Sequence, residues 1–451
     1  MGKKLFIIVL VLALLIAALT LTASAAEIDS GSCGSNLTWS LDDSGTLTIS
    51  GTGAMANYDY GGAPWAGYHD RITKVIIGNG VTTIGTSAFW DCNKIPSVSI
   101  PDSVTSIGGW AFYQCSSLTS VEIPQKVTSL GNSAFAFCSG LTSVKLNGNV
   151  TSVNHNSFYE CTRLTTLKLG SGVFELNQTL LDNLTLTSIE VDSGNKTYSA
   201  SKGILLSKNG KTLIYCPKEK SGSLTVPDGV TAIGADAFFD CAKLTSVVLP
   251  NGLKTIGYEA FLHCSKLASV TIPDSLTTIE DYAFYGCKKL SSIEFPEGLA
   301  SIGIAAFEKC SKLASVTIPG SVRTIGVGAF SGCTKLSSVT ISAGVEVIDL
   351  GAFLDCKELT YVFIPVSATK LGNIAFSNSG LEKVYYDGTE DQWNTLLATG
   401  SNQLPAGVQV QFTSLLPRPK DRPSGSSSSA SKTSAIPPKN TGSFYVASFA
   451  P

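Results

Sequence analysis

The hydrophobic positions of this chain recur with a period of 23 residues. In the unit that starts at Leu118, apolar residues stand at Leu118, Val121 and Ile123, and polar residues separate them. This spacing predicts a short β-strand with its apolar face toward the interior of a coil. Pro124 ends the strand because proline has no amide hydrogen for a sheet ladder. A fixed period in the twenties predicts a solenoid, in which each coil buries its apolar side against its neighbours.

The second half of each unit carries the sequence A-F-x-x-C. In the unit from Leu118 we expect Val127 and Leu130 to point inward, Gly131 to permit a turn, and a helical turn to centre Phe135. The same register begins at Ile72, Ile95, Leu118, Leu141, Leu164, Leu186, Ser221, Leu244, Leu267, Leu290, Leu313, Leu336 and Leu359, with a truncated unit at Leu381. The fold class is therefore mainly β with short helical turns, and its core should be continuous from end to end.

The array spans residues 72–380, and other patterns flank it. Residues 27–71 contain two alternating segments around Asp42-Asp43-Ser44-Gly45, which predicts a hairpin that caps the first coil. Residues 381–416 predict a last strand and a short amphipathic helix as the cap at the other end. Residues 417–451 are rich in Pro and Ser, so we expect a disordered tail.

The unit that starts at Leu186 is longer than the others. Its extra residues, about 192–220, hold two apolar runs around Asn209-Gly210, a strong signal for a tight hairpin. We expect this hairpin to project from the body of the solenoid.

Residues 1–26 predict an export signal. Lys3-Lys4 precede an apolar run that ends in Ala23-Ser24-Ala25, a sequence that suits signal peptidase. We expect cleavage after Ala25 or Ala26 and no membrane insertion afterwards. The alternative is an uncleaved membrane anchor, because the run is long for a signal and slightly short for a span of about 20 residues.

The chain has 12 cysteines, an unusual number for an exported protein without an evident disulfide framework. Ten of them occupy the Cys slot of the repeat, where cysteine behaves as a small buried hydrophobe. Stacked coils would bring their Cα atoms within disulfide range, but the side chains would point in parallel. We expect packed free thiols in this slot, and we expect the two cysteines outside it, Cys33 and Cys216, to be unpaired.

Composition excludes several functions. A formal charge of -2 offers no basic excess for phosphate contacts, so we expect no nucleic acid partner. The three histidines lie in separate regions, and no C-x-x-C, H-x-x-x-H or G-x-S-x-G is present. We therefore expect no enzyme activity, no metal and no cofactor.

The slots that vary between units are the better place to look for a binding surface. Two residues after the unit start, nearly every unit has Ser or Thr, which favours packing or a hydroxyl ladder between strands over a glycan-binding face. Four residues after the start the residue type varies, and two groups of aromatics stand near the ends. The tentative binding surface comprises Trp90, Trp110, Tyr113, Glu122, Lys145, Lys168, Tyr361, Phe363 and Tyr385. The alternative is that both aromatic groups pack under the terminal caps.

The unit L-x-x-I-x-I-P-x-x-V-x-x-I-G-x-x-A-F-x-x-C closely resembles the BspA-type leucine-rich repeat of bacterial cell-surface proteins, and the resemblance covers residues 72 to about 380. It implies a leucine-rich-repeat solenoid with a hairpin N-terminal cap and a short C-terminal cap, and it brings no catalytic residues. The implied protein is secreted or on the cell surface and mediates adhesion or protein binding. Its partner would be a protein or a glycan on a host or neighbouring cell, and a glycan-binding module is the alternative function.

Overall fold

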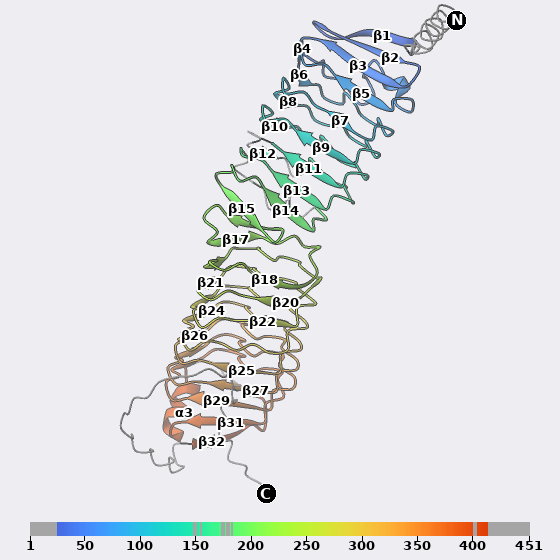
Figure 1. Ribbon diagram of the computed structural model, residues 1–451. Helices are drawn as coiled ribbons and strands as arrows, with labels where there is room; N and C mark the ends of the chain where they lie inside the picture. The colour runs from blue at the N-terminus through green and yellow to red at the C-terminus, as the bar shows by residue number, and fades with distance from the viewer. Residues whose placement is uncertain are drawn as a thin grey trace, which may run out of the picture. The chain divides into compact units, whose positions relative to one another are not determined.

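The repeats form coils that follow one another in chain order (Figure 1). The computed structural model describes residues 25–413 except 148–149, 151, 154–155, 173–175, 177–180, 182–183 and 400–403. The predicted tail at 417–451 and nearly all of the predicted signal peptide at 1–26 lie outside the described residues. Most coils contribute a first strand and a second strand, and strands of each kind pair in parallel with their equivalents in neighbouring coils except where a sheet is interrupted.

The first strands end at the prolines or turns that the repeat predicts. Their register joins equivalent positions of successive units, so that Val144 lies opposite both Val121 and Leu167. The strands of this side are β3 (Thr46–Gly51), β5 (Lys74–Ile77), β7 (Val98–Ser99), β9 (Ser120–Ile123), β11 (Ser143–Leu146), β13 (Thr166–Leu169), β14 (Ser188–Val191), β18 (Gly222–Thr225), β20 (Leu244–Val248), β22 (Ser269–Thr271), β25 (Ser315–Ile318), β27 (Ser338–Ile341), β29 (Tyr361–Pro365), β31 (Lys383–Asp387) and β32 (Gln409–Phe412).

The second strands are shorter because a turn follows each of them at once. They are β4 (Gly53–Ala54), β6 (Val81–Ile84), β8 (Ser106–Ile107), β10 (Ser129–Leu130), β12 (Ser152–Val153), β19 (Ala232–Ile233), β21 (Thr255–Ile256), β23 (Thr278–Ile279), β24 (Ser301–Ile302), β26 (Thr324–Ile325), β28 (Val347–Ile348) and β30 (Lys370–Leu371).

The A-F segment that follows forms successive turns rather than a regular helix. The amide of Ala88 bonds three residues back to Gly85, whereas the amide of Phe89 donates to Ala111 of the next coil at 2.8 Å. The flanking Asp91 has a φ of 56°. Left-handed residues lie four positions apart, at Ser87 and Asp91, and every second N–H from one to the other donates to the next coil. These hydrogen bonds offset a strain of roughly 1–2 kcal/mol per left-handed residue.

The side chains of the repeat fill the interior. Phe112 and Phe135 are fully buried and stack with ring centroids 5.0 Å apart, and the same stacking continues on both sides. Most repeat cysteines do more than pack, as where the Sγ of Cys264 donates to the carbonyl oxygen of Phe238 in the preceding coil at 3.1 Å. All 12 cysteines are buried and free, as the spacing predicts.

The core differs from the continuous one that the repeat predicts. Among the described residues, the buried hydrophobic side chains form two clusters that meet at residues 204–216. Leu205 and Tyr215 belong to the first cluster, and Leu206 and Leu213 belong to the second. The insertion therefore lies at the boundary between two cores.

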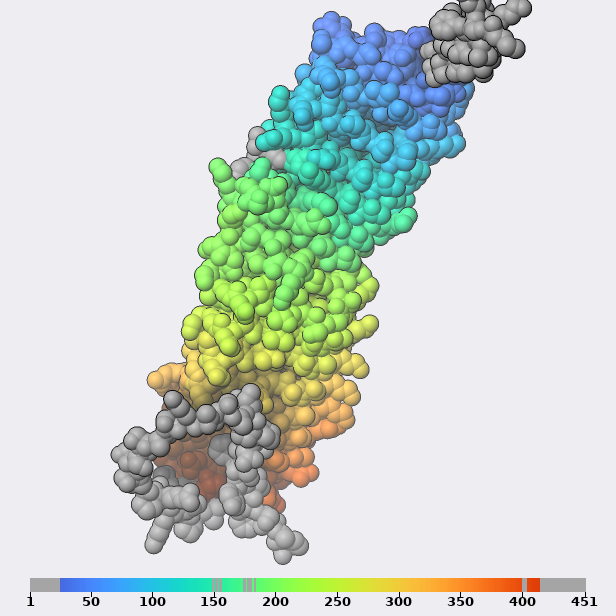
Figure 2. Space-filling model, in the orientation of Figure 1, coloured from blue at the N-terminus to red at the C-terminus, as the bar shows by residue number. Residues whose placement is uncertain are grey.

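The prediction that the inserted hairpin projects from the body is wrong. The insertion forms β15 (Tyr198–Ser201), β16 (Ile204–Ser207) and β17 (Thr212–Tyr215), and β16 and β17 pair antiparallel around Asn209-Gly210. β17 also pairs in parallel with β19, so the hairpin continues the ladder of second strands. Its apolar residues explain this, because burial of Leu205 and Leu213 stabilises the body. In Figure 2 these green residues form part of the body between its cyan and yellow coils.

The segment before the array completes the first coil. β1 (Glu27–Gly34), β2 (Leu37–Asp42) and β3 pair antiparallel, and β3 then pairs in parallel with β5. A short 3-10 helix, η1 (Ala66–Tyr68), follows Trp65, whose ring stacks on Phe89 at 5.8 Å between centroids. The hairpin thus extends the sheet of the array, and Trp65 extends the stack of phenylalanines.

The other end closes with β31, the helix α3 (Glu390–Leu397) and β32. Thr389 and Gln392 form a capping box at the start of α3, and Trp393 and Leu396 bury its apolar side in the second core cluster. β32 adds a strand parallel to β31 that the sequence pattern does not predict. Among the described residues, no helix has both the length and the apolar composition needed to span a membrane.

Candidate functional site

The outward side chains of the first strands form a surface that we call the strand face. Two rows run across it because equivalent residues pair in register. One row contains Ser120, Ser143 and Thr166, and the other contains Glu122, Lys145 and Lys168. Side chains in these rows alternate with buried ones along each strand, as in β9, where Val121 and Ile123 face inward. The strand face thus presents one or two side chains per coil on a fixed backbone.

The charged residues predicted for this surface come together on the strand face. The Nζ of Lys145 lies 2.8 Å from the Oε1 of Glu122, and the Nζ of Lys168 lies 3.0 Å from the Oε2 of Glu190. The hydrogen bond from Lys145, followed by one from Asn147, lowers the pKa of Glu122. These side chains are 44–60% exposed, so the pairs contribute little to stability. In this row, two adjacent lysines lie between two carboxylates. A partner with complementary charges could recognise this arrangement.

The aromatic residues near the end of the array also meet on the strand face. Phe363 and Tyr385 are cross-strand partners whose rings stack with centroids 4.6 Å apart. Tyr361 packs edge-on against both rings and is 38% exposed. Lys383 places its Nζ 5.6 Å from the centre of the Tyr385 ring. Neither cap covers these three rings fully, so they form an exposed ridge, which we call the aromatic ridge.

The aromatic residues near the start lie elsewhere, along the edge formed by the A-F turns, which we call the turn edge. Trp90 packs against Tyr60 of the N-terminal segment with centroids 4.0 Å apart, which fits the packing alternative for this residue. The side chain of Trp110 is 44% exposed, and its backbone is in the left-handed conformation with a φ of 52°. Tyr113 contacts Phe137 of the next coil at 5.2 Å. The three residues thus do not form one cluster.

Sequence reasoning missed two aromatics of the turn edge that lie near Tyr113 in the structure. Phe137 lies between Tyr113 and Tyr159 and is 37% exposed. Tyr159 occupies the same slot after the central Phe as Trp90 and Tyr113, so its position in the repeat could have revealed it. Phe137 stands one residue later, where the repeat has no aromatic in neighbouring coils.

The hydroxyl groups that bridge the coils lie one position earlier than the sequence pattern suggests. The Oγ1 of Thr142 donates to the carbonyl oxygen of Thr119 at 3.0 Å, and the Oγ1 of Thr119 donates to that of Pro96 at 3.1 Å. The serine row beside them, which includes Ser120 and Ser143, points to solvent on the strand face. The side chains of this row are small, so they leave the neighbouring charged row accessible to a partner.

The groups that could support catalysis are dispersed or protonated. Burial raises the pKa of Cys92 and of Cys356 to about 12, which keeps these thiols unreactive. His69 lies 3.7 Å from Asp91, and His263 packs edge-on against Tyr285. In the part of the chain that the structure describes, no three His, Cys, Asp or Glu residues are grouped so as to hold a metal ion.

Comparison with solved structures finds similar chains, and the two with a TM-score of 0.50 share this fold. The pneumococcal vaccine antigen PcpA is 20% identical, with 87% of this chain and 99% of that chain covered and a TM-score of 0.50. A leucine-rich repeat protein from Bacteroides ovatus is 22% identical, with 84% and 98% covered and a TM-score of 0.50. One from Eubacterium ventriosum is 27% identical, with 79% and 96% covered and a TM-score of 0.39. No curated protein matches this chain.

The family model gives the assignment. The model for the BspA type leucine rich repeat region matches with 6 copies over residues 66–195, 214–304 and 277–395, which is more than half of the chain. The matched residues contain the strands, the A-F turns and the Cys slot described above. The resemblance seen in the repeat is thus confirmed, and the chain belongs to the BspA-type leucine-rich repeat family.

Proposed function

We propose that this protein is an exported, non-enzymatic protein of the cell surface that binds a protein partner through its strand face. The observation that carries the proposal is the aromatic ridge. Three aromatic side chains from two neighbouring strands, Tyr361, Phe363 and Tyr385, meet on an outward surface. Aromatic residues dominate the binding energy of protein interfaces, whereas isolated exposed ones are common and have no such meaning.

The surroundings of the aromatic ridge suit a protein interface. The preceding strand, β27, places Ser338 and Thr340 beside it, and β32 places Gln409 and Gln411 on its other side. A ring of small and polar side chains around an aromatic centre excludes water from the centre of an interface. The ridge is therefore the expected energetic centre, and the ion pairs around Lys145 and Lys168 are expected to set orientation.

Export and surface location rest on the pattern of residues 1–26 and on the family, whose repeat is described for bacterial cell-surface proteins. Attachment to the cell or release from it is compatible with this proposal. The absence of a catalytic role rests on the dispersed histidines and the buried thiols.

A glycan is the second candidate partner, because exposed tyrosine rings can stack on sugars. The edge-on packing of Tyr361 against Phe363 and Tyr385 favours a protein, since it covers part of each ring face that a sugar would need.

The test is capture of a partner by purified protein from extracts of host matrix and of neighbouring cells, with a glycan array as the second arm. Tyr361→Ala combined with Tyr385→Ala should abolish capture. Tyr258→Ala is the matched control, because Tyr258 is 43% exposed on the turn edge. Capture that survives loss of the ridge, or a glycan signal that the ridge variants abolish, would contradict the proposal.

A further inference from the structure

Lysines gather in the insertion. Residues 196–220 contain six lysines, at 196, 202, 208, 211, 218 and 220, and one acidic residue, Glu219. Their formal charge of +5 contrasts with -2 for the whole chain, so the remainder of the chain carries -7. The chain therefore contains a basic region in the middle of the array, although its net charge is slightly negative.

Backbone carbonyl groups hold three of these lysines. The Nζ of Lys202 donates to Thr225 at 3.0 Å, that of Lys220 to Lys202 at 2.6 Å, and that of Lys208 to Ser193 at 3.0 Å. Among the described residues, no carboxylate forms an ion pair with any of the three. A carbonyl oxygen fixes the position of an ammonium group but does not neutralise its charge, so the positive charge stays available to a partner.

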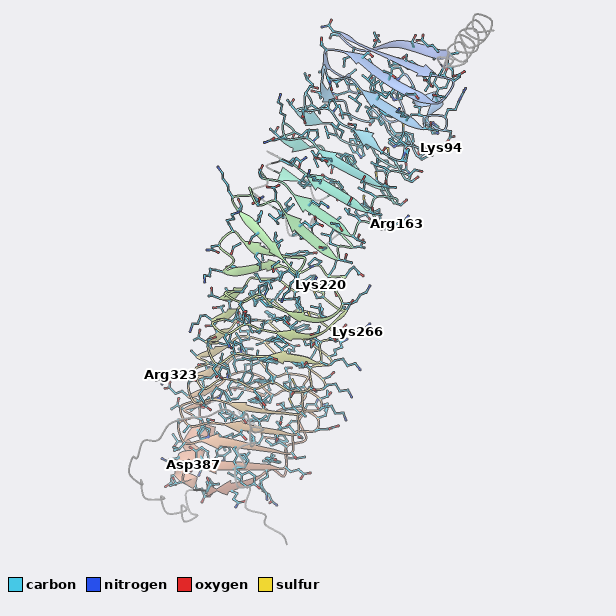
Figure 3. All side chains as sticks on the ribbon, in the orientation of Figure 1. Lys94, Arg163, Lys220, Lys266, Arg323 and Asp387 are labelled. Carbon is cyan, nitrogen blue, oxygen red and sulfur yellow. The ribbon has the colours of Figure 1, made fainter. Side chains whose placement is uncertain are left out.

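Lys202 and Lys220 lie on the strand face where its ladder is interrupted. The first strands on either side are β14 and β18, and between them the amide of Ile189 bonds to the carbonyl oxygen of Gly203 at 3.0 Å. Figure 3 labels Lys220 between these strands. The basic region is thus continuous with the surface assigned above to partner binding.

Gly203 packs closely against Ser188 and Lys220. Its φ is +78°, and a Cβ there would lie 2.9 Å from the Oγ of Ser188 and 3.2 Å from the Nζ of Lys220. A hydroxyl donor and an ammonium donor therefore lie close together beside the backbone of Gly203. A carboxylate of a partner can accept hydrogen bonds from both donors.

We propose that this surface, Lys202 and Lys220 with Ser188, binds an acidic segment of the protein partner. The inference rests on the proposed function and names the chemistry of the partner. The surroundings of the lysines favour a protein over a polyanionic chain. Two carboxylates border the lysines: Glu190, which forms an ion pair with Lys168, and Glu219, which forms one with Lys243. A uniformly charged chain would meet these carboxylates, whereas a protein surface can place cations or neutral groups there.

The test measures binding of a short fluorescent peptide, in which glutamates alternate with serines, to the full chain by anisotropy at low and high salt. We expect salt-sensitive binding that Lys202→Gln with Lys220→Gln weakens about tenfold, since each such contact is charge-assisted. Lys266→Gln with Lys289→Gln removes the same charge from exposed positions elsewhere and should change affinity less than about twofold. Lys202→Arg with Lys220→Arg keeps the charge and should keep binding, which separates charge from folding.

Equal binding by both glutamine pairs would overturn the inference, as would tighter binding of dextran sulfate than of the glutamate–serine peptide. Either result leaves partner capture through the aromatic ridge untouched. If the ridge variants instead fail to affect capture, the proposed function is wrong while the peptide measurement still reports on the lysines.

Discussion

The indole Nε1 of Trp65 donates a hydrogen bond of 2.8 Å to the carbonyl oxygen of Ala88. In later coils the corresponding carbonyl oxygen accepts a hydrogen bond from an amide of the preceding coil, as that of Ala111 accepts one from the amide of Phe89. Trp65 therefore replaces a preceding coil in two ways, because its ring also stacks on Phe89. A single side chain satisfies the hydrogen bonding and the packing at the open end of the array.

Trp65→Phe should remove this hydrogen bond while keeping an aromatic ring. The buried carbonyl of Ala88 would lose its donor, which should lower the free energy of unfolding by roughly 1–3 kcal/mol. Urea denaturation would measure it. Trp110→Phe, at an exposed position, should change the value by less than about 0.5 kcal/mol. Equal effects of the two changes would contradict the capping role.

Phe135 and Phe137 are a matched pair within one coil. Phe135 is fully buried between Phe112 and Phe158, and Phe137 is 37% exposed. Phe135→Ala should cost about 3–5 kcal/mol in unfolding free energy because it leaves a cavity. Phe137→Ala should cost less than about 1.5 kcal/mol, the loss of its ring contacts. Thermal or urea melts would measure both, and a loss below about 1 kcal/mol for Phe135→Ala would show that the Phe slot is not central.

Leu213 tests whether the insertion belongs to the body. Its side chain is fully buried in the second core cluster, so Leu213→Ala should lower the unfolding free energy by about 2–5 kcal/mol. Lys211→Ala changes an exposed residue of the same hairpin and should stay within about 0.5 kcal/mol. If denaturant melts find both changes small, the hairpin is peripheral to folding.

The buried thiols predict a loss of stability in alkali. Burial raises the pKa of Cys356 from 9.0 to about 12. Above pH 9 the unfolded chain releases this proton while the folded chain keeps it, so the unfolding free energy falls as the pH rises from about 9 to 12 and is unaffected by this group below 9. Each such thiol contributes about 1.4 kcal/mol per pH unit in that window.

Urea melts under reducing conditions at several pH values would measure this slope. Cys356→Ala should show a shallower fall than the unchanged chain, because one buried thiol is missing and the tyrosines and lysines are common to both. An identical slope would mean that Cys356 ionises in the folded protein.

The interior could be predicted from the repeat because it follows from local periodicity. Leu118, Val121 and Phe135 lie where their spacing indicates, and the free thiols follow from a shared slot. The turns around Phe89 could not be predicted in detail, since their left-handed residues depend on hydrogen bonds to the next coil. The sequence pattern within one unit does not reveal the hydrogen bonds that this unit makes to the next.

The candidate surface was predictable only in part, for the same reason. Register in the repeat brings Glu122 to Lys145 and Phe363 to Tyr385, because equivalent positions become neighbours. The insertion breaks this register, so the placement of Lys202 and Lys220 on the strand face required the structure. Trp90 was assigned to the surface as one of a group of aromatics near the start of the array, but Tyr60 packs against it.

The central claim is that the strand face binds the partner, and the affinity of the captured partner for single-site variants tests it most directly. The dissociation constant should rise at least about tenfold for Tyr361→Ala, the loss expected for an aromatic anchor, and should not change for Tyr258→Ala on the turn edge. The reverse result, with Tyr258→Ala weakening binding and Tyr361→Ala leaving it intact, would contradict the account.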